Sequence, residues 1–82
     1  MSQFFYVYIL HSEIEPERFY TGFTQDLPKR LGAHNSGRIH HSSKWKPWRL
    51  KTYSAFSDRS RAAQFDRYLK SGSGRAFTKG HL

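Results

Sequence analysis

Two tyrosines and two basic residues in the first half of the chain have the types and spacing for acid–base chemistry on a charged substrate. Tyr8 lies in the apolar run Phe4–Leu10, Tyr20 follows in a second aromatic piece, and Arg30 and His34 come next, one helical turn apart. A tyrosine hydroxyl accepts a proton only if its pKa is lowered, and a nearby cation lowers it. We therefore expect Arg30 to lower the pKa of these tyrosines and His34 to carry a second proton.

Arg30 is also suited to binding a phosphate. Its guanidinium can hold a phosphate through two parallel hydrogen bonds and stabilise negative charge that builds up during cleavage. Taken singly, each of these residues has a simpler explanation. Tyr8 and Tyr20 are then strand aromatics with exposed hydroxyls, Arg30 is a solvated helix residue, and His34 is a packing residue.

Asp66 is the acid most suggestive of a metal site. It falls on the margin of the apolar stripe of an expected helix, where an unpaired carboxylate is costly. Arg67 and Lys70 could neutralise it at the surface. Alternatively, Mg²⁺ could be held there through this one carboxylate, water and a substrate phosphate. The adjacent His40 and His41 predict no zinc site, because the chain has no cysteine and no carboxylate close to them in sequence.

Three strands are expected to position the tyrosines. Runs rich in strand-forming residues predict strands at Phe4–Leu10, Arg18–Phe23 and Trp48–Phe56, the first two as an antiparallel hairpin. Gly22 inside the second strand indicates either a close backbone approach or a bulge.

Two helices are expected to carry the other candidates. The first is capped by Asp26, tolerates Pro28 in its first turn and stops at Gly37. One stripe of this helix holds Leu27, Leu31 and His34, with Arg30 at its edge. The second is capped by Ser57 or Asp58, runs to about Lys70 and is ended by residues 71–74. We expect a polar loop at 38–47 and a short or frayed terminal helix at 75–82.

The order of these elements predicts the fold class. A β-β-α-β-α-α chain of 82 residues is expected to form one small α+β domain over residues 1–82, with a three-stranded, mainly antiparallel sheet flanked by two to three helices.

The charge distribution favours a polyanionic partner. The net charge is +8, and no acid occurs from Leu27 to Ser57. Phosphates are attracted to such a tract, and bases can stack on its aromatics Trp45, Trp48 and Tyr53. A solvated face that keeps the protein soluble is the alternative. The expected nucleic-acid contacts are Lys29, Arg38, His40, Lys44, Lys46 and Arg49.

Other features of the sequence bear on disulfides, membrane segments and cellular location. The lack of cysteine excludes disulfides and thiolate metal sites. The run Phe4–Leu10 is too short to span a bilayer, and residues 1–3 lack the basic start of a signal peptide. We therefore expect a cytoplasmic protein.

These features together resemble the GIY-YIG nuclease family along nearly the whole chain. The two signature triplets are matched by Tyr6-Val7-Tyr8 and Tyr20-Thr21-Gly22, and the family's arginine and histidine by Arg30 and His34. Asp66 stands where the family carries a metal-binding glutamate. The stretch Tyr68–Phe77 looks like the ending of the family's small stand-alone bacterial branch.

The resemblance implies metal-assisted hydrolysis of a nucleic-acid phosphodiester, most simply DNA, with one Mg²⁺ or Mn²⁺ ion. Tyr8 would be the general base or would position the attacking water, and Tyr20 and His34 would support that proton transfer. Arg30 would stabilise the transition state and Asp66 would hold the metal. Larger relatives, including a DNA-repair incision module, attach further domains for targeting, so this chain would select its substrate through its own basic loop or a targeting partner.

The sequence departs from the family's pattern at three positions. Tyr6 replaces the first signature glycine, Thr21 replaces an isoleucine, and Asp66 is one methylene shorter than glutamate.

Three functions are considered for the chain. It is interpreted as an endonuclease, as a nucleic-acid-binding module of the same fold without cleavage, or as an accessory protein whose exposed Trp45 and Trp48 contact another protein.

Overall fold

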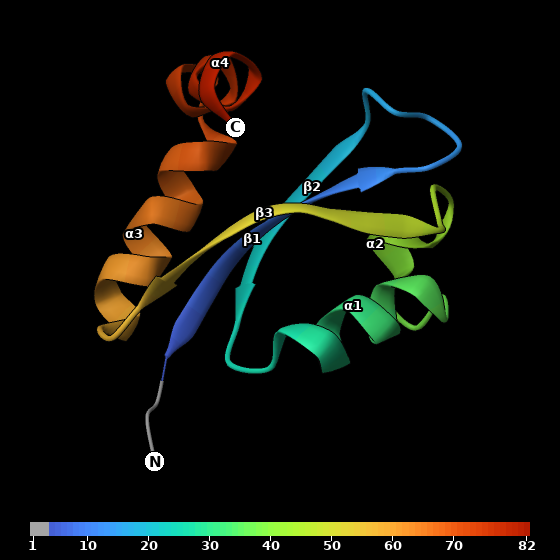
Figure 1. Ribbon diagram of the computed structural model, residues 1–82, viewed down its shortest axis with the longest axis horizontal. Coiled ribbons are helices and arrows are strands. Elements are labelled where there is room, and N and C mark those ends of the chain that lie inside the picture. Colours follow the sequence, from blue (N-terminus) through green and yellow to red (C-terminus); the bar gives the residue numbers. More distant parts are fainter. Residues whose placement is uncertain (1–3) are drawn as a thin grey trace.

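The computed structural model describes residues 4–82 as a three-stranded sheet with four helices (Figure 1). The strands are β1 (Phe5–Ser12), β2 (Phe19–Thr24) and β3 (Trp48–Phe56), in the order β2-β1-β3 with both pairings antiparallel. The helices are α1 (Leu27–Asn35), α2 (His40–Ser43), α3 (Arg59–Lys70) and α4 (Gly72–His81). The predicted α+β class is confirmed. Residues 1–3, used above to argue against a signal peptide, lie outside the described range.

The hairpin β1–β2 is present as predicted, but β1 ends two residues later and β2 is shifted by one residue along the chain. Tyr8 pairs with Gly22 and Leu10 pairs with Tyr20, and the ladder extends from Tyr6 opposite Thr24 to His11 opposite Phe19. β1 is therefore the central strand, and β2 is an edge strand whose outer side is open.

Alternation along β1 gives the sheet two different faces. Val7 and Ile9 pack against α3 with Ala62 and Leu69, whereas Tyr8 and Leu10 face the other side. There they meet Tyr20, Trp48 and the apolar stripe of α1. Figure 1 shows α3 and α1 on opposite sides of the sheet. Because β2 is the edge strand, groups from both faces can meet around it.

Helix α1 begins and ends with the local signals seen in the sequence. The Asp26 side chain accepts a hydrogen bond from the Lys29 backbone N–H, and Pro28 lies in the first turn. Gly37 follows the helix with φ +82°, a left-handed conformation that glycine adopts without strain. This helix holds Arg30 and His34 one turn apart.

The expectation of a loop at 38–47 is wrong in part, because His40–Ser43 form the single turn α2. Tertiary contacts stabilise this turn against weak local propensity. Ser42 is fully buried, and its carbonyl accepts a hydrogen bond from the indole N–H of Trp48.

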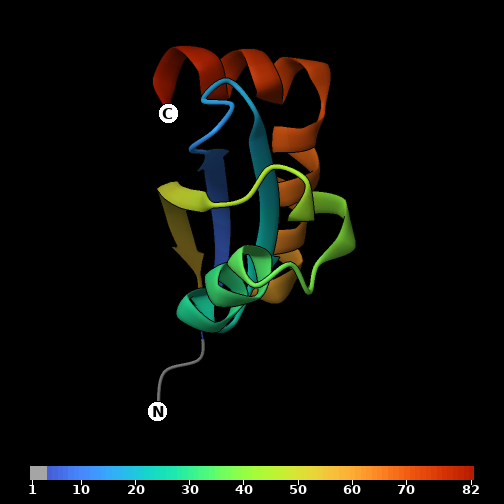
Figure 2. The same ribbon diagram turned by 90° about the vertical axis from the view of Figure 1, so that its right-hand side faces the viewer.

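Helix α4 starts earlier than expected, immediately after α3. Ser71 ends α3 and caps α4, since its side chain accepts a hydrogen bond from the Gly74 N–H. A Cβ at Gly74 would overlap the Tyr68 carbonyl oxygen, so the corner requires glycine there. Figure 2 shows α4 running across the end of α3, close to the β1–β2 turn. Within residues 4–82 no helix has the length and apolarity needed to cross a bilayer.

Candidate active site

Tyr8 reaches across β2 because its neighbour there has no side chain. Gly22 is its partner in the ladder, and a Cβ at Gly22 would lie 2.7 Å from the Tyr8 hydroxyl oxygen. The close approach predicted at Gly22 is thus present. The sheet's irregularity lies instead between Ile9 and Leu10, in the pairing with β3.

The Tyr8 hydroxyl is the first group in a chain of hydrogen bonds that runs through His34 to Ser42. It lies 3.1 Å from Nε2 of His34, and His34 Nδ1 lies 2.6 Å from the Ser42 hydroxyl oxygen. Ser42 donates its own proton to the Ile39 carbonyl. From this bond we assign the tautomer of His34: the Ser42 oxygen accepts from Nδ1–H, which leaves Nε2 as the acceptor of the Tyr8 proton.

Aromatic rings enclose His34, which is completely buried. Its ring centroid lies 4.5 Å from that of Tyr20 and 6.5 Å from that of Trp48, and the rings of Tyr8 and Tyr20 stack at 6.4 Å. Trp48 is only 3% exposed, so its expected roles in stacking bases or contacting a protein are wrong. It instead supports the turn that carries Ser42.

The predicted effect of Arg30 on the tyrosines is outweighed at Tyr8. Burial, with a contribution from Tyr20, raises the pKa of Tyr8 to about 12, although the positive charge of Arg30 acts to lower it. Burial and the charge of Arg30 lower the pKa of His34 to about 4. Both groups are therefore neutral at pH 7, and a proton can pass between them only along the bond they share.

Asp66 is a buried carboxylate with one unused oxygen. The residue is 7% exposed, its Oδ2 accepts a hydrogen bond from Lys70 at 3.1 Å, and its Oδ1 has no partner among residues 4–82. Its negative charge is the smallest of the causes that act on the pKa of Tyr8, which it raises, so the carboxylate lies within electrostatic range of that hydroxyl. Of the two neutralising cations considered above, Lys70 is the one that binds.

This donor set fits a hard divalent cation and not zinc. Within residues 4–82, no three His, Cys, Asp or Glu side chains cluster as metal ligands. Mg²⁺ and Mn²⁺ accept a site with one carboxylate when water and substrate phosphate complete the coordination, and the free Oδ1 of Asp66 offers that carboxylate oxygen.

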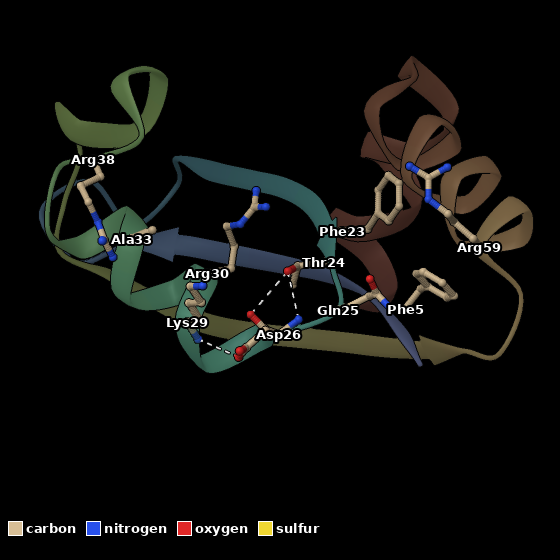
Figure 3. Close-up of a pocket in the computed structure, with 10 residues that line it drawn as sticks. All are labelled: Phe5, Phe23, Thr24, Gln25, Asp26, Lys29, Arg30, Ala33, Arg38 and Arg59. Atoms are coloured by element: carbon tan, nitrogen blue, oxygen red, sulfur yellow. Dashed lines mark hydrogen bonds between the residues drawn. The ribbon is translucent and has the colours of Figure 1, made fainter. Parts of the chain in front are cut away.

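A basic pocket of about 600 Å³ adjoins this site (Figure 3). It brings together the end of β2 with Phe23 and Thr24, the exposed side of α1, and the start of α3. Figure 3 shows the α1 cations on one side, and Phe23 and Arg59 on the other. Its four cations are Lys29, Arg30, Arg38 and Arg59. Its one acid, Asp26, is engaged in capping α1.

The expected nucleic-acid contacts separate in the structure. Lys29 and Arg38 line this pocket with Arg30, whereas His40, Lys44, Lys46 and Arg49 do not. Arg49 lies 3.8 Å from the Glu13 carboxylate, and Lys44 lies over the Trp45 ring. The first pocket therefore gathers only part of the basic tract.

Two contributing residues were missed by sequence reasoning. Ser42 orients His34 from another helix, and a serine in a polar segment carries no signal for that role. Arg59 lies at the start of α3, far along the chain from Arg30, and only the fold brings both to one pocket. Asn35, next to His34, forms hydrogen bonds with the backbone carbonyl and N–H of Trp48, and these bonds also were not foreseen.

Comparison with known proteins agrees with this geometry. The profile described as "GIY-YIG catalytic domain" matches residues 4–79. A UPF0213 protein of Haloquadratum walsbyi is 33% identical over 72 residues, covering 87% of this chain and 79% of that protein. The solution structure of the UPF0213 protein BH0048 from Bacillus halodurans superposes with a TM-score of 0.56 at 30% identity, covering 93% of this chain and 80% of that one.

A third relative carries an activity in its name. The structure-specific endonuclease subunit SLX1 of Scheffersomyces stipitis is 40% identical over 53 residues, which is 57% of this chain but only 16% of that subunit. The profile match, in contrast, spans nearly all of the described residues. The chain therefore belongs to the GIY-YIG family of nuclease catalytic domains.

Proposed function

We propose that this protein is a metal-dependent endonuclease that hydrolyses phosphodiester bonds of DNA. One observation carries the proposal. The Tyr8 hydroxyl is bound to the neutral, buried His34 within the electrostatic reach of Asp66, whose Oδ1 is unused. Arg30 stands at the adjoining pocket. Membership in a nuclease family supports this reading.

The hydrogen-bond chain defines a path for one proton. Tyr8 donates to Nε2 of His34, so lone pairs of the Tyr8 oxygen remain available to accept a hydrogen bond from an attacking water. As the water loses its proton to that oxygen, the phenol proton can move to Nε2. Tyr8 then stays neutral throughout, which agrees with its raised pKa. Positioned proton transfer of this kind contributes about 10²–10⁴-fold to a rate.

The charged residues act on the phosphate. Arg30 can hold two of its oxygens and stabilise the charge that develops on them. Asp66 would hold the cation, which when bound supplies positive charge to the phosphate and lowers the pKa of its water. Lys70 already binds Oδ2 of Asp66 and keeps the carboxylate oriented.

The test uses supercoiled plasmid, single strands and branched junctions, with Mg²⁺ or Mn²⁺ and with a chelator. We expect nicking that needs the metal and that falls at least about 100-fold in Tyr8→Phe while DNA binding is kept. Tyr53→Phe is the matched control, because that phenol is 51% exposed and lies on β3. Equal cutting by wild type and Asp66→Asn would mark the activity as a contaminant.

Metal binding has its own readout. Mn²⁺ binding only the folded wild-type protein should raise its melting temperature, and Asp66→Asn should remove that increase. An increase that is equal in both proteins would place the ion elsewhere.

One alternative function is favoured by a specific observation. The Lys70 ammonium already neutralises Asp66, as in a DNA-binding module that does not cut. In that case Arg30→Ala weakens DNA binding, wild type shows no metal-dependent nicking, and Asp66→Asn leaves DNA affinity unchanged.

A further inference from the structure

We propose that a second basic pocket, formed by β2, the end of α3 and α4, binds a backbone phosphate of the same DNA about three nucleotides from the one that is cut. This inference rests on the proposed function. The pocket measures about 820 Å³ and lies at the opposite end of β2 from the pocket of Arg30. Its lining residues on α3 and α4 are Leu69, Lys70, Arg75, Thr78 and Lys79.

The second pocket begins at the candidate active site. Tyr20 lines it and also packs on His34, while Lys70 lines it and also binds Asp66. Along β2, Tyr20 in this pocket and Phe23 in the first are three residues apart, or about 10 Å. One strand of B-form DNA has a phosphate every 3.4 Å or so along its axis. A strand passing the active site therefore brings phosphates about three nucleotides apart to the two pockets.

The chemistry of the lining favours a phosphate. Arg75 and Lys79 lie one turn apart on α4, both are exposed, and within residues 4–82 neither forms an ion pair. Thr78 between them has a hydroxyl without a hydrogen-bond partner in that range. The other cations here are Arg18, which lies over the Trp45 ring, and Lys70. The pocket is also lined by His41, Glu15 and Glu17. Its four Lys and Arg side chains outnumber the two acids, so its net charge is positive.

The position of α4 is held firmly enough to present these side chains. The Ser71 cap and the contact between Gly74 and the Tyr68 carbonyl define the corner between α3 and α4. Figure 2 shows that this corner turns α4 back across the end of the sheet, beside the start of β2. Arg75 and Lys79 thus belong to a preformed surface, which reduces the entropy lost on binding.

The experiment measures binding of a fluorescein-labelled 20-mer, single-stranded and duplex, in a chelator so that no cutting occurs. The variant is Arg75→Ala/Lys79→Ala, and the matched control is Arg61→Ala/Arg67→Ala. The control removes the same charge from α3 at positions that line neither pocket. We expect the variant to lose about tenfold or more in affinity at 0.1 M salt. Its slope of log K against log salt should fall by about 0.7 for single strands and 0.9 for duplex, because one phosphate contact is lost.

Equal losses in variant and control would overturn the proposal, because they would reflect net charge alone. Circular dichroism checks folding, and Arg75→Gln/Lys79→Gln repeats the test with polar, uncharged side chains that are longer than alanine. Failure of wild type to nick DNA, with the binding difference intact, would overturn the endonuclease proposal while supporting the second pocket.

Discussion

At the scale of single residues, burial keeps both members of the hydrogen-bonded pair Tyr8 and His34 neutral. The pKa of Tyr8 is raised to about 12 and that of His34 is lowered to about 4, with burial as the largest cause of each shift. Desolvation disfavours both charged forms, so the bond between the hydroxyl and Nε2 joins two neutral groups. A neutral pair can transfer a proton during the reaction without storing a charge in the resting protein.

The lowered pKa of His34 predicts how stability depends on pH. The unfolded chain takes up a proton near pH 6.5, whereas the folded chain takes it up only near pH 4. Stability is therefore full above pH 6.5 and falls as the pH decreases toward 4. At pH 5 the loss is about 2 kcal/mol. Urea unfolding at pH 7.5 and pH 5 measures it, and His34→Gln should flatten the dependence by that amount. An unchanged dependence in the variant would assign the titration to another group.

At the scale of elements, the edge strand β2 determines where the hydroxyl of Tyr8 lies. β2 has β1 on one side only, and at Gly22 it leaves room for the Tyr8 ring to cross it. Groups from α1 and α3, which cover opposite faces of the sheet, then meet around the open side of β2 (Figure 1). The missing side chain at Gly22 thus lets Tyr8 of the hairpin reach the side of β2 where groups from α1 and α3 meet.

Two glycine substitutions separate this steric role from general backbone effects. In Gly22→Ala the new methyl overlaps the Tyr8 hydroxyl, so we expect a loss of about 1–3 kcal/mol in stability and a strong loss of cleavage. Gly32→Ala in α1 meets no atom within 4 Å, and helix propensity should make it about 1 kcal/mol more stable. Urea unfolding and the nicking assay measure both. If Gly22→Ala were as stable and active as wild type, Tyr8 would not need this passage.

At the scale of the whole molecule, the fold places different basic side chains in two separate pockets. Of the tract that lacks acids, Lys29, Arg30 and Arg38 reach the first pocket, where Arg59 joins them from another helix. The second pocket draws its cations largely from α3 and α4, outside that tract. Eight of the fourteen Lys and Arg residues thus line the two pockets at the ends of β2.

The sorting predicts unequal effects for equal changes in charge. Lys29→Ala/Arg38→Ala should weaken DNA binding and reduce the salt slope by about 1.4–1.8, because two phosphate contacts are lost. Lys44→Ala/Lys46→Ala removes the same charge from residues that line neither pocket, so its slope should stay close to that of wild type. Fluorescence anisotropy at several salt concentrations gives both slopes. The reverse order would locate the DNA on the 44–46 side of the molecule.

The elements and the candidate residues could be predicted from the sequence because their signals are local. Apolar runs, the caps Asp26 and Asp58 and the stop at Gly37 each depend on neighbours along the chain. The hairpin order alone placed Tyr8 near Tyr20, and helix spacing alone placed Arg30 near His34. The family resemblance rested on the same short motifs.

Tertiary structure decided what depends on burial and on distant partners. The pKa of Tyr8 rises although a cation is near, because desolvation outweighs the charge of Arg30. Trp48 became a support for Ser42, and Arg59 joined Arg30 at one pocket. The two pockets at the ends of β2 exist only once both helices are packed. Each of these outcomes follows from which atoms exclude water, and that is a property of the packed chain.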